Sequence, residues 1–264
     1  MDKIVVTGAS SFVGSSLASY LSGLKYKVVG TGSKQKSKYS GIRNSRIGYI
    51  ESSGCSYNIL NILDRNKINE FIKKHSPTYW FHLPAWTDNY GSHDFNLDKA
   101  YELNIKPLDI IFSKLSENNC KGFIHVGSEA EYGGNNSAYK EDDPCYPTTP
   151  YGFSKLMQTI RIKQLANRYS LKARVGRVFT PFGKYENPTK LLNQVLGSLK
   201  KNKILELSPC EQSRDFIFIN DLVTGFGKLI DDCMREEIFD IFNISSGIPT
   251  RLKDLLNEIV TLTN

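Results

Sequence analysis

Short apolar runs alternate with amphipathic stretches along the first two thirds of the chain. Amphipathic periodicity of this kind indicates helices. A short apolar strand followed by a helix, repeated several times, is typical of βαβ units around a buried parallel sheet. The pattern therefore predicts an α/β fold with a doubly wound parallel sheet. The expected strands are residues 4–6, 28–29, 79–83, 123–126 and 173–178, with helices over 12–21, 68–74, 103–115 and 155–169.

The chain after Val178 has a different rhythm. Proline and glycine interrupt it, which indicates a loop. Asn220 and Asp221 stand where they can cap a following helix. The stretch 31–60 is rich in Ser, Gly, Lys and Asn, and it predicts one strand without a clear position. The remaining expected elements are a helix over 191–199 and strands over 216–219 and 238–244.

This change in the pattern of the sequence predicts that the chain folds into two parts. Residues 1–179 and 215–244 are expected to form the main domain, because the late strand can return to the main sheet. Residues 180–214 and 245–264 are expected to form a small C-terminal lobe over the carboxyl edge of that sheet. Open α/β sheets bind ligands at this edge, so the lobe would bind a substrate.

Composition narrows the function classes. The 264 residues are 40% hydrophobic and 23% charged, as in ordinary globular proteins. The net charge is +7, but the lysines are scattered among acidic residues. A scattered excess is typical of a solvated surface, so no nucleic-acid partner is predicted. A basic protein also attracts anionic small molecules, among them sugar diphosphates.

The five cysteines and four histidines are scattered along the chain. The odd cysteine count and wide spacing predict neither a disulfide framework nor a metal site. They favour a reducing compartment, and we expect a cytoplasmic protein. A long apolar segment is absent from the sequence, so no signal peptide, membrane span or membrane partner is expected.

The segment from Thr7 to Gly14 reads TGASSFVG and lies between the first strand and the first helix. Gly8 permits a tight turn, and Gly14 permits close packing of helix and strand. The helix N-terminus offers free N–H groups to a pyrophosphate. The segment therefore predicts a dinucleotide site, with an ordinary βα turn as the alternative.

Tyr151 and Lys155 lie four residues apart on a predicted helix that Thr149 and Pro150 begin. A free tyrosine has a pKa of about 10, and a nearby ammonium lowers it. The pair can therefore act as acid or base near neutral pH. Ser128 follows the strand that begins at Phe123, where its hydroxyl can bind a substrate oxygen. A chance Tyr-x-x-x-Lys pair and a turn serine are the alternatives.

These three features follow one another in order, each at a strand end. In this combination the chain resembles the extended branch of the short-chain dehydrogenase/reductase family, which holds nucleotide-sugar epimerases, dehydratases and reductases. The resemblance implies a Rossmann-type fold, a nicotinamide cofactor and a homodimer formed through residues 104–115 and 155–167. It extends over segments 81–85, 177–183, 214–216 and 242–247 and the asparagine Asn104.

The resemblance also implies roles for individual residues. Arg214 would hold the diphosphate of the substrate, since a guanidinium suits phosphate oxygens. The implied catalytic residues are Ser128, Tyr151, Lys155 and Asn104. The implied substrate-binding residues are Thr87, Ser128, Glu129, Thr180 and Arg214. The implied cofactor-binding residues are Gly8, Ser10, Ser11, Phe12, Val13, Gly14, Ser33, Lys34, Asn61, Ile62, Leu83, Pro84, Ala85, Tyr151 and Lys155.

Several positions depart from the family pattern. Ser11 replaces the middle glycine of the turn and would crowd the pyrophosphate. Thr180 and Pro84 replace the usual Asn and Ala. An acidic residue near Gly32, which would accept the ribose hydroxyls of NAD, is absent, while Ser33 and Lys34 could bind a 2′-phosphate. NADP(H) is therefore favoured over NAD(H). The alternative is that Lys34, Lys36 and Lys38 form only a solvated face of this loop.

The residues after Ser128 bear on the reaction. Glu129 is acidic, but Ala130 cannot serve as the base that 4,6-dehydratases of the family use. The cysteine of the epimerase-reductases is missing from the same position. Segment 211–218 most resembles 4-keto-6-deoxy-sugar nucleotide reductases, including the CDP-abequose and CDP-paratose synthases of surface polysaccharide pathways.

We therefore predict an NADPH-dependent reduction of the 4-keto group of a nucleoside-diphosphate 4-keto-6-deoxyhexose. Tyr151 would donate the proton, and Lys155 would tune Tyr151. Asn104 would support Lys155 through water. The alternatives are a nucleotide-sugar 4-epimerase on the same scaffold and a non-catalytic NAD(P)-binding sensor or scaffold.

Overall fold

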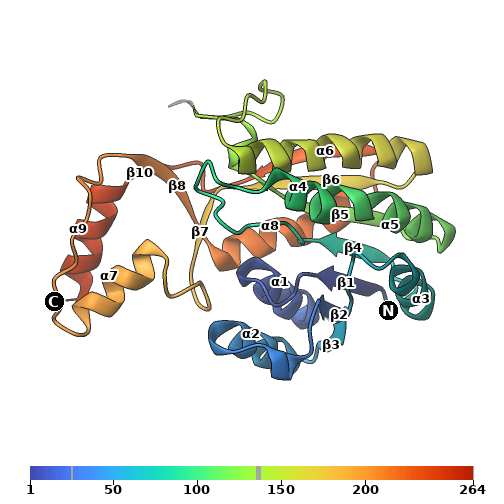
Figure 1. The fold of residues 1–264 in the computed structure, drawn as a ribbon, viewed down its shortest axis with the longest axis horizontal. Helices are drawn as coiled ribbons and strands as arrows, with labels where there is room; N and C mark the ends of the chain where they lie inside the picture. The colour runs from blue at the N-terminus through green and yellow to red at the C-terminus, as the bar shows by residue number, and fades with distance from the viewer. Residues whose placement is uncertain (25, 135–137, 264) are drawn as a thin grey trace.

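A computed structural model describes residues 1–24, 26–134 and 138–263. Its main sheet contains seven parallel strands in the order β3-β2-β1-β4-β5-β6-β9 (Figure 1). The order reverses between β1 and β4, which makes the sheet doubly wound and confirms the predicted fold class. The strands are β1 Lys3–Thr7, β2 Lys27–Gly32, β3 Ser56–Ile59, β4 Tyr79–His82, β5 Gly122–Ser128, β6 Ala173–Val178 and β9 Phe239–Ile244.

Helices cover both faces of this sheet, and each face has its own apolar core. Leu17 and Phe226 are fully buried in the core on one face, and Trp80 and Phe112 are fully buried in the core on the other. One layer contains α1 (Phe12–Gly23), α2 (Gly41–Ser52) and α8 (Ile219–Asp232). The opposite layer contains α3 (Arg65–His75), α5 (Lys106–Glu117) and α6 (Pro150–Tyr169).

A small second sheet lies beyond the carboxyl edge of the main sheet. Its central strand, β8, pairs in parallel with β7 and antiparallel with β10. Figure 1 shows this sheet and two helices at the left, set apart from the main sheet. The proposed boundaries of the two parts stay a prediction. The elements are β7 (Thr180–Phe182), α7 (Leu191–Leu199), β8 (Ser213–Phe218), β10 (Pro249–Arg251) and α9 (Leu252–Thr263).

Short turns of helix connect the longer elements. A single π-helical turn leads directly into α5 and carries Asn104. Pro107 lies in the first turn of α5, where its missing N–H costs no hydrogen bond. The short elements are η1 (Lys36–Lys38), α4 (Leu97–Ala100), η2 (Tyr101–Ile105) and η3 (Glu129–Glu131).

One expectation was incomplete and one was wrong. Residues 31–60 contain the helix α2 as well as a strand, and polar residues on the exposed side of α2 hide its apolar stripe of Ile47 and Ile50. The predicted cap at Asn220 and Asp221 is wrong, because α8 begins at Ile219 with Phe218 at the N-cap position. Asp221 instead lies in the first turn, where its charge favours the helix dipole. Within the described ranges, no helix is long and apolar enough to cross a bilayer.

Candidate active site

The turn between β1 and α1 has the geometry that a dinucleotide site requires. Gly8 has a φ of +72°, which favours glycine. A Cβ at Gly14 would lie 2.4 Å from the Gly8 carbonyl oxygen, so only glycine fits there. The N-terminus of α1 therefore packs directly against the end of β1. This cradle suits the pyrophosphate of a nicotinamide dinucleotide.

Ser11 occupies the middle of this turn and caps the helix. Its hydroxyl accepts a hydrogen bond from the Gly14 N–H at 3.1 Å, and its own N–H donates to the Gly8 carbonyl at 3.0 Å. The replacement of glycine by serine is thus accommodated as an N-cap. Of the neighbouring predicted residues, Ser10 is buried, and Phe12 and Val13 pack partly against the core.

Two tyrosine hydroxyls lie at the end of β2. The sequence has no acidic residue near this point, where NAD-binding sites usually place a carboxylate. A Cβ at Gly32 would lie 2.1 Å from the Tyr57 hydroxyl oxygen and 3.2 Å from that of Tyr39. Tyr57 donates to the Lys34 carbonyl at 3.0 Å. The Tyr39 hydroxyl hydrogen-bonds with Ser33, which places the predicted Ser33 and Lys34 beside this pair. Sequence reasoning missed both tyrosines.

Arg46 of α2 is a second residue that sequence reasoning missed. Its guanidinium is buried and donates to the carbonyls of Ser10 at 3.4 Å and Tyr185 at 2.9 Å. Burial, reinforced by Arg43, lowers its pKa to about 10. Arg46 thus links the dinucleotide turn to the loop that follows β7. Its position depends on α2, which the sequence pattern did not reveal.

The remaining predicted cofactor residues follow β3 and β4. Leu83 and Pro84 lie against Gly8, since a Cβ there would be 3.3 Å from the Leu83 Cβ. Ala85 is half-buried beside them. Asn61 is exposed and accepts the Leu63 N–H at 3.1 Å. Ile62 buries its side chain in the apolar core, so only its backbone is left to face a cofactor.

Ser128 and Tyr151 meet at the carboxyl end of β5. Thr149 caps α6 by accepting the Gly152 N–H at 3.1 Å, which places Tyr151 in the first turn. Tyr151 and Ser128 hydrogen-bond through their side chains. The rings of Tyr90 and Phe95 cover the Tyr151 ring edge-on, with centroids 5.5 and 5.9 Å away.

The predicted lowering of the Tyr151 pKa by Lys155 is wrong in this structure. Burial raises the pKa of Tyr151 to about 12, while the hydrogen bond with Ser128 lowers it and the charges of Glu131 and Tyr90 raise it. Lys155 does not offset this burial, because its ammonium donates to the sheet and to Gln158 and not to the phenol. Tyr151 therefore holds its proton firmly at neutral pH.

Lys155 is 2% exposed, and its ammonium group donates into the sheet. Its Nζ donates to the Val126 carbonyl at 2.8 Å, to Gln158 Oε1 at 2.9 Å and to His125 Nε2 at 3.1 Å. Burial lowers the pKa of Lys155 to about 8, although the charge of Glu131 opposes this. The lysine is therefore close to half protonated near pH 8.

Asn104 lies on the π-helical turn before α5 and is fully buried. Its Oδ1 accepts the Trp86 N–H at 2.8 Å. Its Nδ2 has no hydrogen-bond partner among the described residues, so a donor is left over at the site. The predicted support of Lys155 through water stays a prediction.

Three of the predicted substrate residues come together at the edge of the small sheet. Thr180 donates to Glu129 Oε1 at 3.3 Å. Burial raises the pKa of Glu129, and the charge of the exposed Arg214 opposes this. Arg214 is therefore close enough to act on Glu129 while its guanidinium is open to solvent. Thr87 lies exposed in the loop after β4 and does not join this group.

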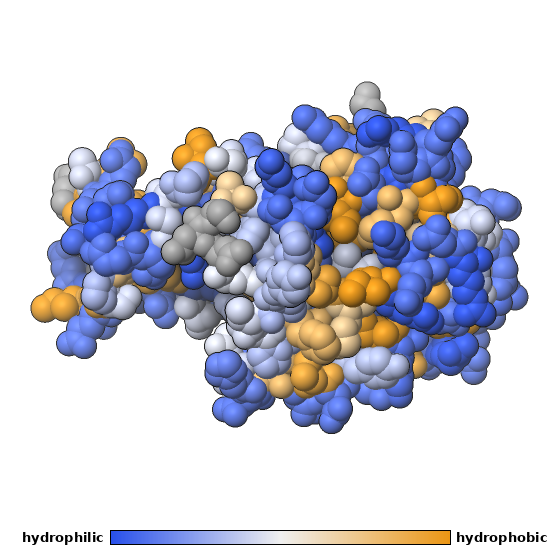
Figure 2. Space-filling view, turned by 90° about the horizontal axis from the view of Figure 1, so that it is seen from above, coloured by the Kyte–Doolittle hydropathy of each residue, from blue (hydrophilic) through white to orange (hydrophobic). Residues whose placement is uncertain are grey.

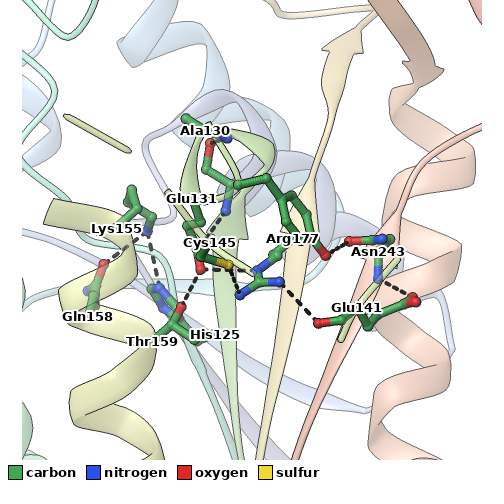
Figure 3. A network of polar contacts seen from close by, with 12 residues as sticks. His125, Ala130, Glu131, Glu141, Cys145, Lys155, Gln158, Thr159, Arg177 and Asn243 are labelled. Carbon is green, nitrogen blue, oxygen red and sulfur yellow. Dashed lines mark hydrogen bonds and ion pairs between the residues drawn. The ribbon is translucent and has the colours of Figure 1, made fainter. Parts of the chain in front are cut away.

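A buried ion pair beneath Ser128 was also missed. Glu131 Oε2 lies 3.1 Å from Arg177 Nε, and both side chains are almost completely buried (Figure 3). The spacing of Ser128 and Glu131 is a capping-box pattern, which could have revealed it. Within the described ranges, no cluster of three or more His, Cys, Asp or Glu residues could hold a metal ion.

These contacts define the chemistry that is available at the sheet edge. A protonated phenol and a serine hydroxyl meet at the carboxyl end of β5, and a buried ammonium lies one helical turn away on α6. The set can donate a proton to an oxygen atom and can orient that oxygen. An exposed guanidinium lies farther out along the same edge. This is the arrangement of a proton-transferring site next to a dinucleotide site.

Comparison with known proteins identifies the class. The model of the NAD-dependent epimerase/dehydratase family matches residues 4–245. The chain therefore belongs to the NAD-dependent epimerase/dehydratase family. This confirms the predicted family and the prediction of an NAD(P)-dependent enzyme of nucleotide-sugar chemistry.

Individual relatives carry several different activities. The chain is 26% identical to the dTDP-4-dehydro-6-deoxyglucose reductase of Escherichia coli, over 97% of this chain and 80% of the relative. It is 23% identical to the dTDP-D-glucose 4,6-dehydratase of Dictyostelium discoideum, over 100% of this chain and 62% of the relative. A crystal structure of UDP-glucuronic acid 4-epimerase from Bacillus cereus, in complex with UDP-glucuronic acid and NAD, superimposes with a TM-score of 0.82. It shares 22% identity, over 98% of this chain and 83% of the other.

Proposed function

We propose that this protein reduces the 4-keto group of a nucleoside-diphosphate 4-keto-6-deoxyhexose with NADPH. The observation that carries the proposal is the protonated Tyr151 hydrogen-bonded to Ser128, next to a site that has no base at Ala130. A reduction needs a proton donor at the carbonyl oxygen, whereas dehydration needs a base at this position. A reductase among the relatives that match almost the whole chain supports the same reaction.

The chain's own residues account for the transfer of a proton to the carbonyl oxygen. Ser128 would donate a hydrogen bond to the C4 carbonyl oxygen and so orient it. Tyr151 would give its phenolic proton to the oxygen as negative charge develops there. Lys155 lies one helical turn away, and its ammonium would turn from its partners in the sheet toward the resulting phenolate and stabilise it. When bound, a nicotinamide cofactor supplies the hydride that reduces C4.

The outer part of the substrate would lie on the small lobe of residues 180–214 and 245–264. Arg214 is exposed and would hold the diphosphate, which a guanidinium fork binds through paired hydrogen bonds. Glu129 and Thr180 are joined by a hydrogen bond and would face the sugar. Glu129 would accept hydrogen bonds from sugar hydroxyls.

The end of β2 supports NADPH over NADH. NAD-binding sites usually place a carboxylate on the ribose hydroxyls at this point. Here Gly32 stands at the end of the strand, with Tyr39 and Tyr57 packed over it. Lys34 is exposed beside them, and hydroxyl and ammonium groups tolerate a 2′-phosphate that a carboxylate would repel.

The face of α5 and α6 supports a homodimer as the assembly. A groove of about 680 Å³ runs between these helices. Tyr101 and Ile160 are about half exposed along it. Figure 2 shows apolar side chains gathered among hydrophilic residues on the broad part of the molecule. We also propose a cytoplasmic location, which the five free cysteines suit.

The test is NADPH oxidation, followed at 340 nm, with CDP-, dTDP- and GDP-linked 4-keto-6-deoxyhexoses and with NADH in parallel. Consumption of NADPH with one of these sugars would establish the reductase and its nucleotide. Turnover of a nucleotide sugar without net cofactor consumption would show a 4-epimerase instead. Cofactor binding without any turnover would favour a sensor or scaffold.

Tyr151→Phe should lose most of the turnover, at least about a hundredfold, because it removes the proton donor. The dissociation constant for NADPH should change little, since the ring is retained. Tyr146→Phe is the matched control, because Tyr146 is an exposed tyrosine in the preceding loop. Full activity of Tyr151→Phe would contradict the assignment.

A further inference from the structure

Glu131 is a buried carboxylate that the proposed reaction does not use. It ends the short turn η3 and is fully buried. Oε1 accepts the Ser128 N–H at 2.9 Å. Oε2 accepts the Thr159 hydroxyl at 2.9 Å and the Arg177 Nε–H at 3.1 Å. One side chain therefore joins the end of β5, the middle of α6 and strand β6 (Figure 3).

Arg177 extends this network to the loop that precedes Tyr151. Its guanidinium donates to the Glu141 carbonyl at 3.4 Å and to Cys145 Sγ at 3.1 Å. It also lies over the Tyr132 ring, 4.3 Å from the centroid. The ion pair of Glu131 and Arg177 thus holds both segments that deliver the site, one with Ser128 and one with Tyr151.

The turn itself does not require a charge at residue 131. A glutamine at this position of a capping box satisfies the same backbone N–H. A buried ion pair is costly to desolvate, and apolar replacements are often no less stable. The charge therefore calls for an explanation beyond the hydrogen bonds of the turn.

We propose that Glu131 is a positioning residue of the active site, which holds Ser128 in place and fixes a negative charge against α6, one helical turn from Lys155. This inference rests on the proposed function, because a reductase needs Tyr151 to carry a proton. The geometry supports it, since the carboxylate lies directly under Ser128 on the helix α6 side. The same negative charge favours an ammonium and disfavours a phenolate.

The electrostatics have the direction that the proposal requires. The charge of Glu131 raises the pKa of Lys155 against burial and raises the pKa of Tyr151 together with burial. The other groups that face Lys155 are His125 and, behind it, His82. Burial lowers the pKa of both imidazoles far below neutrality, so neither changes charge near pH 8.

Other titratable or polar groups face Tyr151 and Glu131. Ser128 and Tyr90 face Tyr151. Arg177 faces Glu131 from β6, and burial raises the pKa of Cys145 beside it, which keeps the thiol neutral. Glu131 therefore acts on both Tyr151 and Lys155, and Arg177 is its ion-pair partner.

The test is the titration of Lys155, followed by NMR in full-length protein labelled with ¹³C at the lysine Cε. A Lys155→Gln spectrum identifies the signal. The wild-type midpoint should lie near pH 8. Glu131→Gln should lower it by roughly one pH unit, because the negative charge is lost and Arg177 remains. Arg177→Gln should raise it, and Glu131→Gln/Arg177→Gln, in which the two amides can pair, should return it toward the wild-type value.

Thr159→Val is the matched control, because it removes a hydrogen bond to Glu131 and leaves the charge. The Lys155 titration midpoint of Thr159→Val should stay within about 0.3 pH units of the wild-type midpoint. This is well below the shift expected from a lost charge. Should Glu131→Gln fail to fold, Arg177→Gln tests the proposal with the opposite sign. An unchanged midpoint in the folded single variant would overturn it.

Kinetics provide a second readout. In Glu131→Gln the alkaline limb of the kcat profile should move to lower pH by the same amount, with KM for the nucleotide sugar changed less than about threefold. A purely structural role would lower kcat equally at every pH. The Lys155 titration does not depend on turnover, so a wild-type protein without reductase activity would contradict the proposed function and leave this test intact.

Discussion

Two buried histidines lie behind Lys155 and complete its environment. His125 Nδ1 donates to the His82 carbonyl at 2.9 Å, so Nε2 is left to accept from Lys155. The His82 ring stacks on Phe123, with centroids 5.4 Å apart. Its Nε2 has no partner among the described residues. Both imidazoles are therefore held neutral by burial rather than by an acidic partner.

This burial predicts a loss of stability in mild acid. Unfolded histidines have a pKa of about 6.5, whereas burial lowers the pKa of His82 to about 3 and that of His125 well below 6.5. The unfolded chain thus binds more protons, and the free energy of unfolding should fall below pH 6.5. The slope should approach about 1.4 kcal/mol per pH unit for each buried histidine.

Urea unfolding at pH 7, 6 and 5 measures this slope. His82→Gln removes one of the two fully buried histidines and should make the slope shallower by up to about 1.4 kcal/mol per pH unit. His93→Gln is the control, because His93 is exposed. Equal slopes in wild type and His82→Gln would show that His82 is not buried in its neutral form.

At the scale of elements, the turn from β1 to α1 is the most constrained connection. The Ser11 hydroxyl and the Gly8 carbonyl both lie within 3 Å of where a Cβ of Gly14 would stand. The helix cannot move outward freely, because Leu17 and Leu21 of α1 are buried against the sheet. The turn is therefore tight because the apolar face of the helix packs on the sheet.

Gly14→Ala should destabilise the protein by about 1–3 kcal/mol, since overpacking outweighs the gain in helix propensity. It should also weaken NADPH binding, because the turn must open. Gly23→Ala, at the other end of α1, meets nothing within 4 Å and is the matched control. Urea unfolding and NADPH titration measure both effects, and equal stability of the two variants would contradict the packing argument.

At the scale of the whole molecule, the groove of α5 and α6 is an uncovered face with its own charges. Asp109 lies at 3.5 Å from both Arg161 and Arg168, and these charges border the half-exposed Tyr101 and Ile160. An apolar strip with charged borders resembles the anatomy of a protein interface. A second copy of the chain would bury Ile160 in the centre of such an interface.

Ile160→Asp should therefore convert a dimer into a monomer. An unpaired carboxylate in an apolar interface should weaken dimerisation by roughly a hundredfold or more. Light scattering after size-exclusion chromatography measures the mass. Leu262→Asp on α9 replaces another exposed apolar residue and should leave the mass unchanged. A wild-type protein that is monomeric at high concentration would refute the dimer.

Much of the site could be predicted because its signals are local. A glycine-rich turn, a capped helix with Tyr151 and Lys155 on one face, and a serine after a strand all depend on neighbours within a few residues. Glu129, Thr180 and Arg214 were grouped through the family resemblance, and the structure brings them together. The misplaced cap of α8 was a local error of two residues, and the missed α2 reflects its weak apolar stripe.

By itself, then, the sequence determined the parallel sheet and the order of elements along its edge, because alternating apolar and amphipathic segments have few ways to bury their faces. Only the tertiary structure decided which charged and polar groups surround the site residues. The direction of the Lys155 ammonium, the burial of Glu131 with Arg177, and the two tyrosines over Gly32 depend on contacts between distant segments. Charges act through space, so their effect is set by the packing that brings them together.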